Sequence, residues 1–256
     1  MARYGILSDI HGNLPALEAA LEALDALGVD ELLCLGDVVG YGPFPAECTD
    51  LVTERCSVIV QGNHEEAVLD PRVARTFNGA ARAAAAWTRF ALDDDRTRRI
   101  ASWPLMTETG PNRRILCVHD SPAPGPSAYI HDAGVAEVAF RGFEGPLCLH
   151  GHTHLPTVFR IARDGVAGPD GGRGIHGGAL AAGEGVHLDA GWRWLCNPGS
   201  IGQPRDADPR ASFGLLDCEA GTFTVHRAAY DVARVQAATI EAGLPEVLST
   251  RLAVGA

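Results

Sequence analysis

The first sixty residues alternate short apolar runs with amphipathic segments. The runs at 4–8, 32–35 and 57–60 have the length and composition of buried strands. Leucines recur at helical spacing through residues 14–27, and a second helix is expected near residues 45–53. Connections this short predict parallel strands joined by right-handed crossovers.

The middle of the chain has helical character and the second half is rich in strands. The alanine-rich residues 73–92 predict a helix, followed by a charged segment at 93–99 and a turn at Trp103-Pro104. Further strands are expected at 114–118, 146–149, 157–162, 193–196, 212–217 and 222–228, with helices near 132–140 and 232–242. Hairpin-like connections such as 218–221 predict a mixed sheet or two stacked sheets, an α/β fold of the α+β type.

Residues 164–191 depart from this pattern, because ten of the 28 are glycine. We interpret this glycine-rich insertion as a surface excursion between two strands, with a lid that closes on substrate as the alternative. No other stretch has the composition of a linker, so a single domain over residues 1–256 is expected.

Composition and charge narrow the classes of partner. The chain has 256 residues, of which 46% are hydrophobic, enough for a substantial core, and a formal net charge of −11. No stretch of the sequence clusters basic residues, whereas a nucleic-acid polymer needs a localised positive surface. We therefore expect no nucleic-acid polymer as partner, although a small nucleotide remains compatible with this charge.

The sequence also predicts where the protein acts. It contains no run of about 20 apolar residues that would span a bilayer, and its first residues do not resemble a signal peptide. The seven cysteines form no C-x-x-C pair, so we interpret them as buried thiols rather than zinc ligands and expect a cytoplasmic protein that binds no membrane.

Polar segments follow five of the predicted strands directly. Because the carboxyl ends of strands are where open α/β sheets form their sites, these segments are expected to meet. They are Ser8-Asp9-Ile10-His11, Gly36-Asp37, Gly62-Asn63-His64-Glu65, Cys117-Val118-His119-Asp120 and His150-Gly151-His152-Thr153-His154. Any one of them would be compatible with an ordinary structural residue, but five in this order indicate a metal site.

The spacing and the residue types agree with that interpretation. In an extended chain residues i and i+2 point to the same side, which would pair Asp9 with His11 and His152 with His154. Glycines before the polar residues permit close backbone approach. A mixture of carboxylate and imidazole ligands suits Mn²⁺, Fe²⁺, Zn²⁺ or Ni²⁺ better than Ca²⁺.

This ordered set resembles the calcineurin-like metallophosphoesterase superfamily. Residues 197–205, Asn-Pro-Gly-Ser-Ile-Gly-Gln-Pro-Arg, are similar to the tail motif of its small bacterial and archaeal phosphodiesterase branch. The resemblance implies a four-layer αββα sandwich of two mixed sheets flanked by helices.

The resemblance also implies the ligands and the reaction. Two divalent ions are implied, Mn²⁺ foremost with Fe, Zn or Ni as alternatives. One would be held by Asp9, His11, Asp37 and His154, and the other by Asp37, Asn63, His119 and His152. His64 would not be a ligand; it would donate a proton to the leaving oxygen or steady the transition state. Hydrolysis would proceed by attack of a hydroxide that bridges the metals.

The sequence departs from the protein phosphatases of that superfamily. Where they carry Gly-Asp-x-x-Asp-Arg-Gly, this chain has Gly40 and Tyr41 in place of the second aspartate and the phosphate-gripping arginine. A dianionic monoester would lose a bidentate partner, so protein phosphatase activity is disfavoured. Arg205 either takes the place of that arginine at the substrate or makes only structural contacts. Tyr41 either stacks on a base or packs the loop wall. Asp120 either accepts a hydrogen bond from an imidazole N–H or is a plain turn residue.

Three functions follow from these residues. The first is a dinuclear-metal phosphodiesterase acting on a small phosphodiester, including nucleotides. The second is a phosphomonoesterase or dinucleotide polyphosphate hydrolase. The third, a non-catalytic metal-binding scaffold, is disfavoured because all seven ligand positions are occupied.

Overall fold

A computed structural model describes residues 2–125, 128–163 and 174–256. The strands form two six-stranded sheets. The first sheet has the order β3-β2-β1-β11-β12-β9 and the second β4-β5-β6-β10-β7-β8. The first contains β1 (Arg3–Leu7), β2 (Glu31–Cys34), β3 (Val58–Ile59), β9 (Gly185–His187), β11 (Ala211–Asp217) and β12 (Thr222–Ala228). The second contains β4 (Met106–Thr109), β5 (Ile115–Val118), β6 (Leu147–Leu149), β7 (Pro156–Ala162), β8 (Ile175–Ala179) and β10 (Trp192–Pro198).

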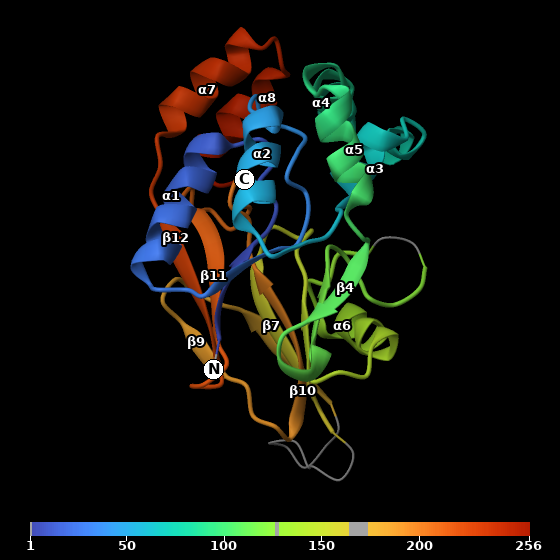
Figure 1. Ribbon diagram of the computed structural model, residues 1–256, viewed down its shortest axis with the longest axis vertical. Helices are drawn as coiled ribbons and strands as arrows, with labels where there is room; N and C mark the ends of the chain where they lie inside the picture. The colour runs from blue at the N-terminus through green and yellow to red at the C-terminus, as the bar shows by residue number, and fades with distance from the viewer. Residues whose placement is uncertain (1, 126–127, 164–173) are drawn as a thin grey trace.

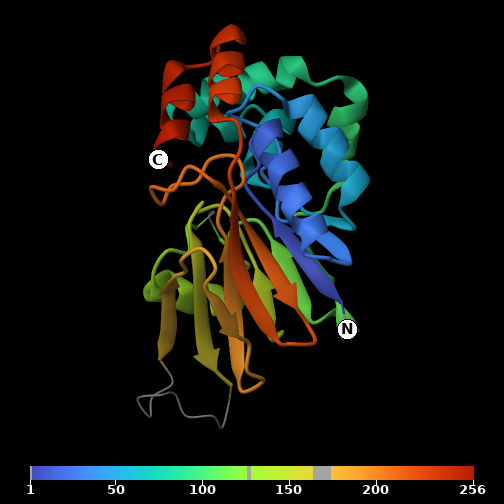
Figure 2. The same ribbon diagram turned by 90° about the vertical axis from the view of Figure 1, so that its left-hand side faces the viewer.

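Eight α-helices flank the sheets in the described part of the chain, and Figures 1 and 2 show most of them gathered at one end of the molecule, beyond the strands. They are α1 (Leu14–Ala26), α2 (Pro45–Arg55), α3 (Asn63–Leu69), α4 (Gly79–Ala91), α5 (Asp94–Ser102), α6 (Ala133–Ala139), α7 (Val232–Glu241) and α8 (Glu246–Thr250). Short 3-10 turns lie at Val73–Thr76, Pro111–Arg113, Phe140–Gly142 and Arg251–Ala253. Among the described residues, no helix combines the length and apolar character needed to cross a membrane.

Three layers of apolar side chains hold the sandwich together. Strand residues alternate between the two faces of a sheet, so Ile6 and Leu33 point into the core between the sheets while Leu7 and Cys34 pack under the helices. The outer face of the second sheet is covered by α6 and Phe140. The four-layer αββα fold expected from the sequence is confirmed.

The strand directions agree with the sequence pattern. β1, β2 and β3 are parallel, as their helical crossovers predict, and β11 and β12 form the expected antiparallel hairpin. Because the parallel strands end at the same edge, the loops that follow β1, β2 and β3 lie side by side there, with those after β5 and β6 of the facing sheet.

Two expectations need correction, and one segment left unassigned is resolved. The predicted helix 73–92 is interrupted: the Asn78 side chain accepts a hydrogen bond from Ala81 N and begins α4 anew. The charged segment 93–99, for which no element was predicted, is largely helical, since Asp93 caps α5. In the glycine-rich insertion, residues 164–173 lie outside the described chain, but 174–191 contain β8 and β9, which pair with β7 and β12. That part belongs to the two sheets rather than to a surface excursion.

Candidate metal centre and substrate cavity

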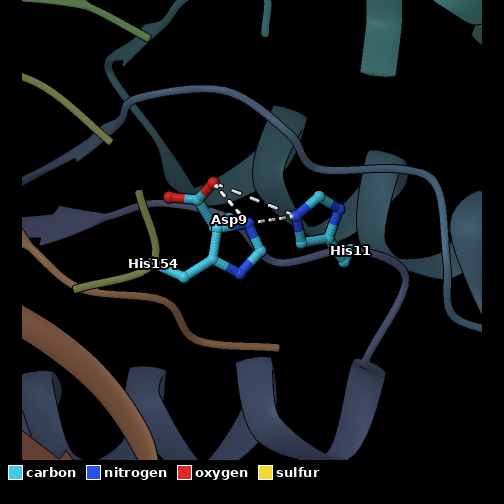
Figure 3. Close-up of side chains that lie close together, drawn as sticks. All are labelled: Asp9, His11 and His154. Carbon is cyan, nitrogen blue, oxygen red and sulfur yellow. Dashed lines mark hydrogen bonds and ion pairs between the residues drawn. The ribbon is translucent and has the colours of Figure 1, made fainter. Parts of the chain in front are cut away.

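Two groups of buried side chains meet at the carboxyl ends of the strands. Asp9, His11 and His154 form one group, in which the ligand atoms lie within 4.8 Å of one another. Figure 3 shows the three side chains pointing toward a common centre. The Nε2 atoms of His11 and His154 are 3.1 Å apart, and Asp9 Oδ1 lies 3.9 Å and 3.3 Å from them, respectively.

Backbone carbonyls determine which nitrogen of each imidazole faces this centre. His11 Nδ1 donates to the Val39 carbonyl at 3.1 Å, and His154 Nδ1 donates to the Gln203 carbonyl at 2.6 Å. A carbonyl only accepts, so the proton of each neutral ring is on Nδ1 and the lone pair is on Nε2. Burial lowers the pKa of both histidines well below the usual value, which keeps them neutral. Two lone pairs and a carboxylate oxygen therefore converge with no proton between them.

The second group contains Asp37, His119 and His152, with ligand atoms again within 4.8 Å. His119 Nε2 lies 3.1 Å from Asp37 Oδ2, and its Nδ1 donates to the Leu35 carbonyl at 2.8 Å. Asp120 was one expected acceptor for an imidazole; at His119 the backbone carbonyl of Leu35 takes that place because the neighbouring strand end lies directly beside the ring.

Asp37 lies between the two groups. Its Oδ2 is also 3.7 Å from His11 Nε2 of the first group. Asn63, at the first turn of α3, has a buried Oδ1 with no hydrogen-bond partner among the described residues, and the same holds for Asp9 Oδ1. Buried acceptors without donors are costly, and a divalent cation would satisfy them. The donor set thus fits the metal ions that the fold family implies.

The backbone that presents these side chains is unusual. Asp9, His11, Asp37, His152 and His154 all have positive φ, between 51° and 68°. Such residues cost about 1–3 kcal/mol each and persist only where the surrounding structure holds them. The extended-chain argument was therefore wrong about the backbone, which makes left-handed turns. Asp9 and His11 nevertheless share a group as expected, whereas His152 and His154 lie in different groups.

Close backbone approach supports these turns. A Cβ on Gly151 would lie 1.9 Å from Ser8 Oγ and 2.7 Å from Asp9 Oδ2, so only glycine fits there. His152 N donates to Asp9 Oδ2 at 3.1 Å, which ties the loop after β6 to the loop after β1.

Glu65 ties the other loops together, a role the sequence reasoning missed. Its buried carboxylate accepts from Asp37 N at 2.8 Å, Val39 N at 3.0 Å and Gly62 N at 2.7 Å. The signal was present, since Glu65 follows His64 in the Asn-His-Glu motif, but its partners are distant in sequence.

His64 forms a third such group with His11 and Asp37, in which the potential ligand atoms again lie within 4.8 Å, and its ring packs among aromatic rings. Its ring lies 4.4 Å from Tyr41, 4.8 Å from His11 and 4.8 Å from Phe77 between centroids. Burial lowers the pKa of His64 to about 4, so the ring is neutral near neutral pH. Tyr41 is 8% exposed, which favours packing over base stacking for this residue.

A cavity of about 430 Å³ opens in front of the site. Its lining includes Asp37, Asn63, His64, His152 and His154, with Tyr41, Phe77, Tyr129 and Arg205 around them. Tyr129 stacks on His152 with the ring centroids 4.0 Å apart, a contact that the sequence did not suggest.

Arg205 lines this cavity, and a hydrogen bond to Gln203 positions its guanidinium. Its Nη2 donates to Gln203 Oε1 at 3.3 Å, and Arg251 Nη1 donates to the same oxygen at 3.0 Å. The Nε of Arg205 is buried without a hydrogen-bond partner among the described residues. Gln203 therefore contacts both residues: its side chain binds Arg205, and its backbone carbonyl accepts from His154.

Comparisons with known proteins agree with this fold and site. Residues 2–221 match the calcineurin-like phosphoesterase superfamily domain. The uncharacterized protein MJ0912 of Methanocaldococcus jannaschii is 31% identical over 252 residues, 98% of this chain and 97% of that protein. Phosphodiesterase YfcE of Escherichia coli is 26% identical over 85% of this chain and 88% of its own length. The crystal structure of a metallophosphoesterase from Sphaerobacter thermophilus covers 100% of this chain and 99% of its own at 41% identity, with a TM-score of 0.83.

A two-sheet sandwich with carboxylate and imidazole donors at its strand ends defines a hydrolase of phosphate esters. The chain belongs to the calcineurin-like phosphoesterase superfamily, as the sequence motifs predicted.

Proposed function

We propose that the chain is a dinuclear-metal-dependent phosphodiesterase that hydrolyses a small phosphodiester, including nucleotides. The observation that carries this proposal is the convergence of imidazole lone pairs on carboxylates. The Nδ1 protons of His11, His119 and His154 are committed to backbone carbonyls, so each Nε2 faces Asp9 or Asp37 as a donor atom. A divalent cation would satisfy these donor atoms, and at His119 it would displace the proton that Asp37 and Asp9 otherwise favour.

The ligand assignment follows the two groups. Asp9, His11 and His154 would hold one ion, and Asn63, His119 and His152 the other, with Asp37 shared between them. We propose Mn²⁺ as the resident ion, with Fe, Zn and Ni as alternatives that suit the same donors. Two ions bound there would supply an activated water and positive charge for the phosphoryl oxygens.

The chain's own residues would orient the ester and assist departure of the alcohol. His64 is neutral, so it would donate one N–H to the leaving oxygen, which lowers the cost of the charge developing there. Arg205 would contact a phosphoryl oxygen from the cavity wall with its guanidinium. These two roles, like the ligand assignment, are proposals that substitution tests.

A diester is favoured over a monoester by the charge around the cavity. Of the described residues that line the cavity, Arg205 is the one arginine, and Tyr41 occupies the position of the family arginine. One guanidinium matches the single negative charge of a diester better than the two charges of a monoester. The relative YfcE is named a phosphodiesterase. A non-catalytic scaffold is disfavoured because all seven predicted ligands lie in the two groups or beside them.

The test compares a matched pair of chromogenic substrates. The Mn²⁺-loaded protein is assayed on bis-p-nitrophenyl phosphate and on p-nitrophenyl phosphate, and we expect a higher kcat/KM on the diester. A higher kcat/KM on the monoester would favour the phosphomonoesterase alternative instead. Absence of turnover on both, in protein shown to bind two ions, would favour the scaffold.

We further propose that the enzyme acts in the reducing cytoplasm on a diffusible small molecule. Its seven cysteines are free thiols, and five of them are buried. Burial raises the pKa of Cys34, Cys48 and Cys148 well above the usual value, so these thiols are unreactive.

A further inference from the structure

A second cavity, of about 380 Å³, adjoins the first beside the proposed metal site. Asn63 and Glu66 line both cavities and so form the ridge between them. The first cavity reaches His64, and the second reaches His119 of the ligand set. The proposed centre thus lies where two cavities meet.

The walls of the second cavity combine apolar side chains with carboxylates. Leu105 and Met106 are 55% and 50% exposed, so their apolar surface is accessible to a ligand in this cavity. Glu66 and Asp120 add negative charge, and they are close enough that Asp120 helps burial raise the pKa of Glu66. Among the described residues that line this cavity, none is an arginine.

The first cavity shares the ridge, including Glu66, but differs in the rest of its lining. It contains the cation of Arg205 and the rings of Tyr41, Phe77 and Tyr129. It also contains His64, the residue proposed to assist the leaving oxygen. The leaving group of a diester therefore belongs in the first cavity, and its other organic group needs a different place.

Resting on the proposed function, we propose that the second cavity binds the organic group that stays on phosphorus, and that it selects an uncharged or cationic group with an apolar part. In the reaction, the P–O bond to the leaving alcohol breaks and a P–O bond to water oxygen forms. One proton of the water ends on the leaving alcohol, and the retained group departs as its phosphate monoester. An anionic retained group, such as a polyphosphate chain, would face Glu66 and Asp120 and be disfavoured.

The test holds the leaving group constant and varies the retained group. The substrates are p-nitrophenyl phosphodiesters whose second group is methyl, phenyl, choline or 3-carboxypropyl. We expect kcat/KM to rise about tenfold from methyl to phenyl and to fall about tenfold from methyl to 3-carboxypropyl, with choline at least equal to methyl. Binding is measured separately by calorimetry with methyl methylphosphonate and phenyl methylphosphonate, which lack the nitrophenyl group.

Two substitutions test whether these substrate preferences arise from the second cavity. Met106→Ala should remove most of the preference for phenyl in both turnover and phosphonate binding, and Asp120→Asn should relieve the penalty on 3-carboxypropyl. Phe90→Ala is the control, because Phe90 is 91% exposed on α4 and lines neither cavity. Unchanged preferences in both variants would overturn this inference while leaving the phosphodiesterase proposal intact. No turnover of the methyl ester by the wild-type protein would instead count against the proposed function itself.

Discussion

Gly40 and His64 are in direct contact, and the contact leaves no room for a side chain at position 40. A Cβ placed on Gly40 would lie 2.1 Å from His64 Nδ1, and the backbone there has a φ of 83°. His64 Nδ1 is buried without a hydrogen-bond partner among the described residues. The ring is oriented instead by packing against Tyr41 and Phe77.

Gly40→Ala should displace His64 and impair catalysis without removing metal. The added methyl group overlaps the imidazole, and misplacement of about 1 Å can cost about 10²-fold in rate. Turnover of a dialkyl phosphodiester, whose poor leaving group needs His64, and the bound metal content would be measured together. Gly79→Ala is the matched control, since a Cβ there meets nothing within 4 Å. Full activity in Gly40→Ala would contradict the packing account.

The loss of turnover caused by His64→Ala should depend on the leaving group of the substrate. A p-nitrophenolate leaves without help, but an alkoxide needs a proton or a hydrogen bond as the P–O bond breaks. We expect a small loss on bis-p-nitrophenyl phosphate and a loss of about 10²- to 10⁴-fold on a dialkyl phosphodiester. Equal losses on the two substrates would show that His64 serves another purpose.

Gln203→Ala should affect substrate affinity more than metal binding. The substitution removes the oxygen that Arg205 and Arg251 share but keeps the backbone carbonyl that accepts from His154. We expect KM for the diester to rise about tenfold, which is the loss of about one hydrogen bond to a charged group. Arg205→Gln should raise KM at least as much, while Arg205→Lys recovers part of it.

If KM is unchanged in both Gln203→Ala and Arg205→Gln, Arg205 is a structural residue of the cavity wall. Bound metal measured in each variant separates this outcome from a loss of the metal centre.

Metal affinity should fall as the pH falls. Burial alone lowers the pKa of His119, but Asp37 and Asp9 outweigh it and raise that pKa well above the usual value in the metal-free protein. The ring is then protonated near neutral pH and must lose its proton to bind an ion, so affinity drops about tenfold per pH unit for each proton displaced.

Calorimetric titration with Mn²⁺ at two pH values, in buffers of different ionisation enthalpy, measures that proton release. His226→Asn is the control, because His226 lies on β12 and is in neither ligand group. An affinity independent of pH would contradict the assignment of His119 as a ligand.

The chain should unfold as one unit. β8 belongs to the second sheet and β9 to the first, so residues 174–191 contribute strands to both sheets. Scanning calorimetry of the metal-free protein is expected to give one transition, with calorimetric and van't Hoff enthalpies equal. Two resolved transitions would show that the sheets, or an inserted unit, melt independently.

Much of the site was predictable because its donors follow strands with strong apolar patterns. The runs before Asp9 and Asp37 identify β1 and β2, and parallel strands bring their ends together. The weaker elements were missed for physical reasons. β8 is rich in glycine, β4 is mostly polar, and α5 is highly charged. These elements therefore lack the apolar periodicity from which strands and helices are recognised in a sequence.

The sequence by itself determined which donor types are present and in what order, because each follows a strand that burial makes recognisable. The tertiary structure alone decided which donors share a centre. His11 and His154 are 143 residues apart, and their Nε2 atoms meet only because the two sheets pack face to face. The same packing sets the imidazole tautomers through Leu35 and Gln203, and it places the two cavities on either side of Asn63.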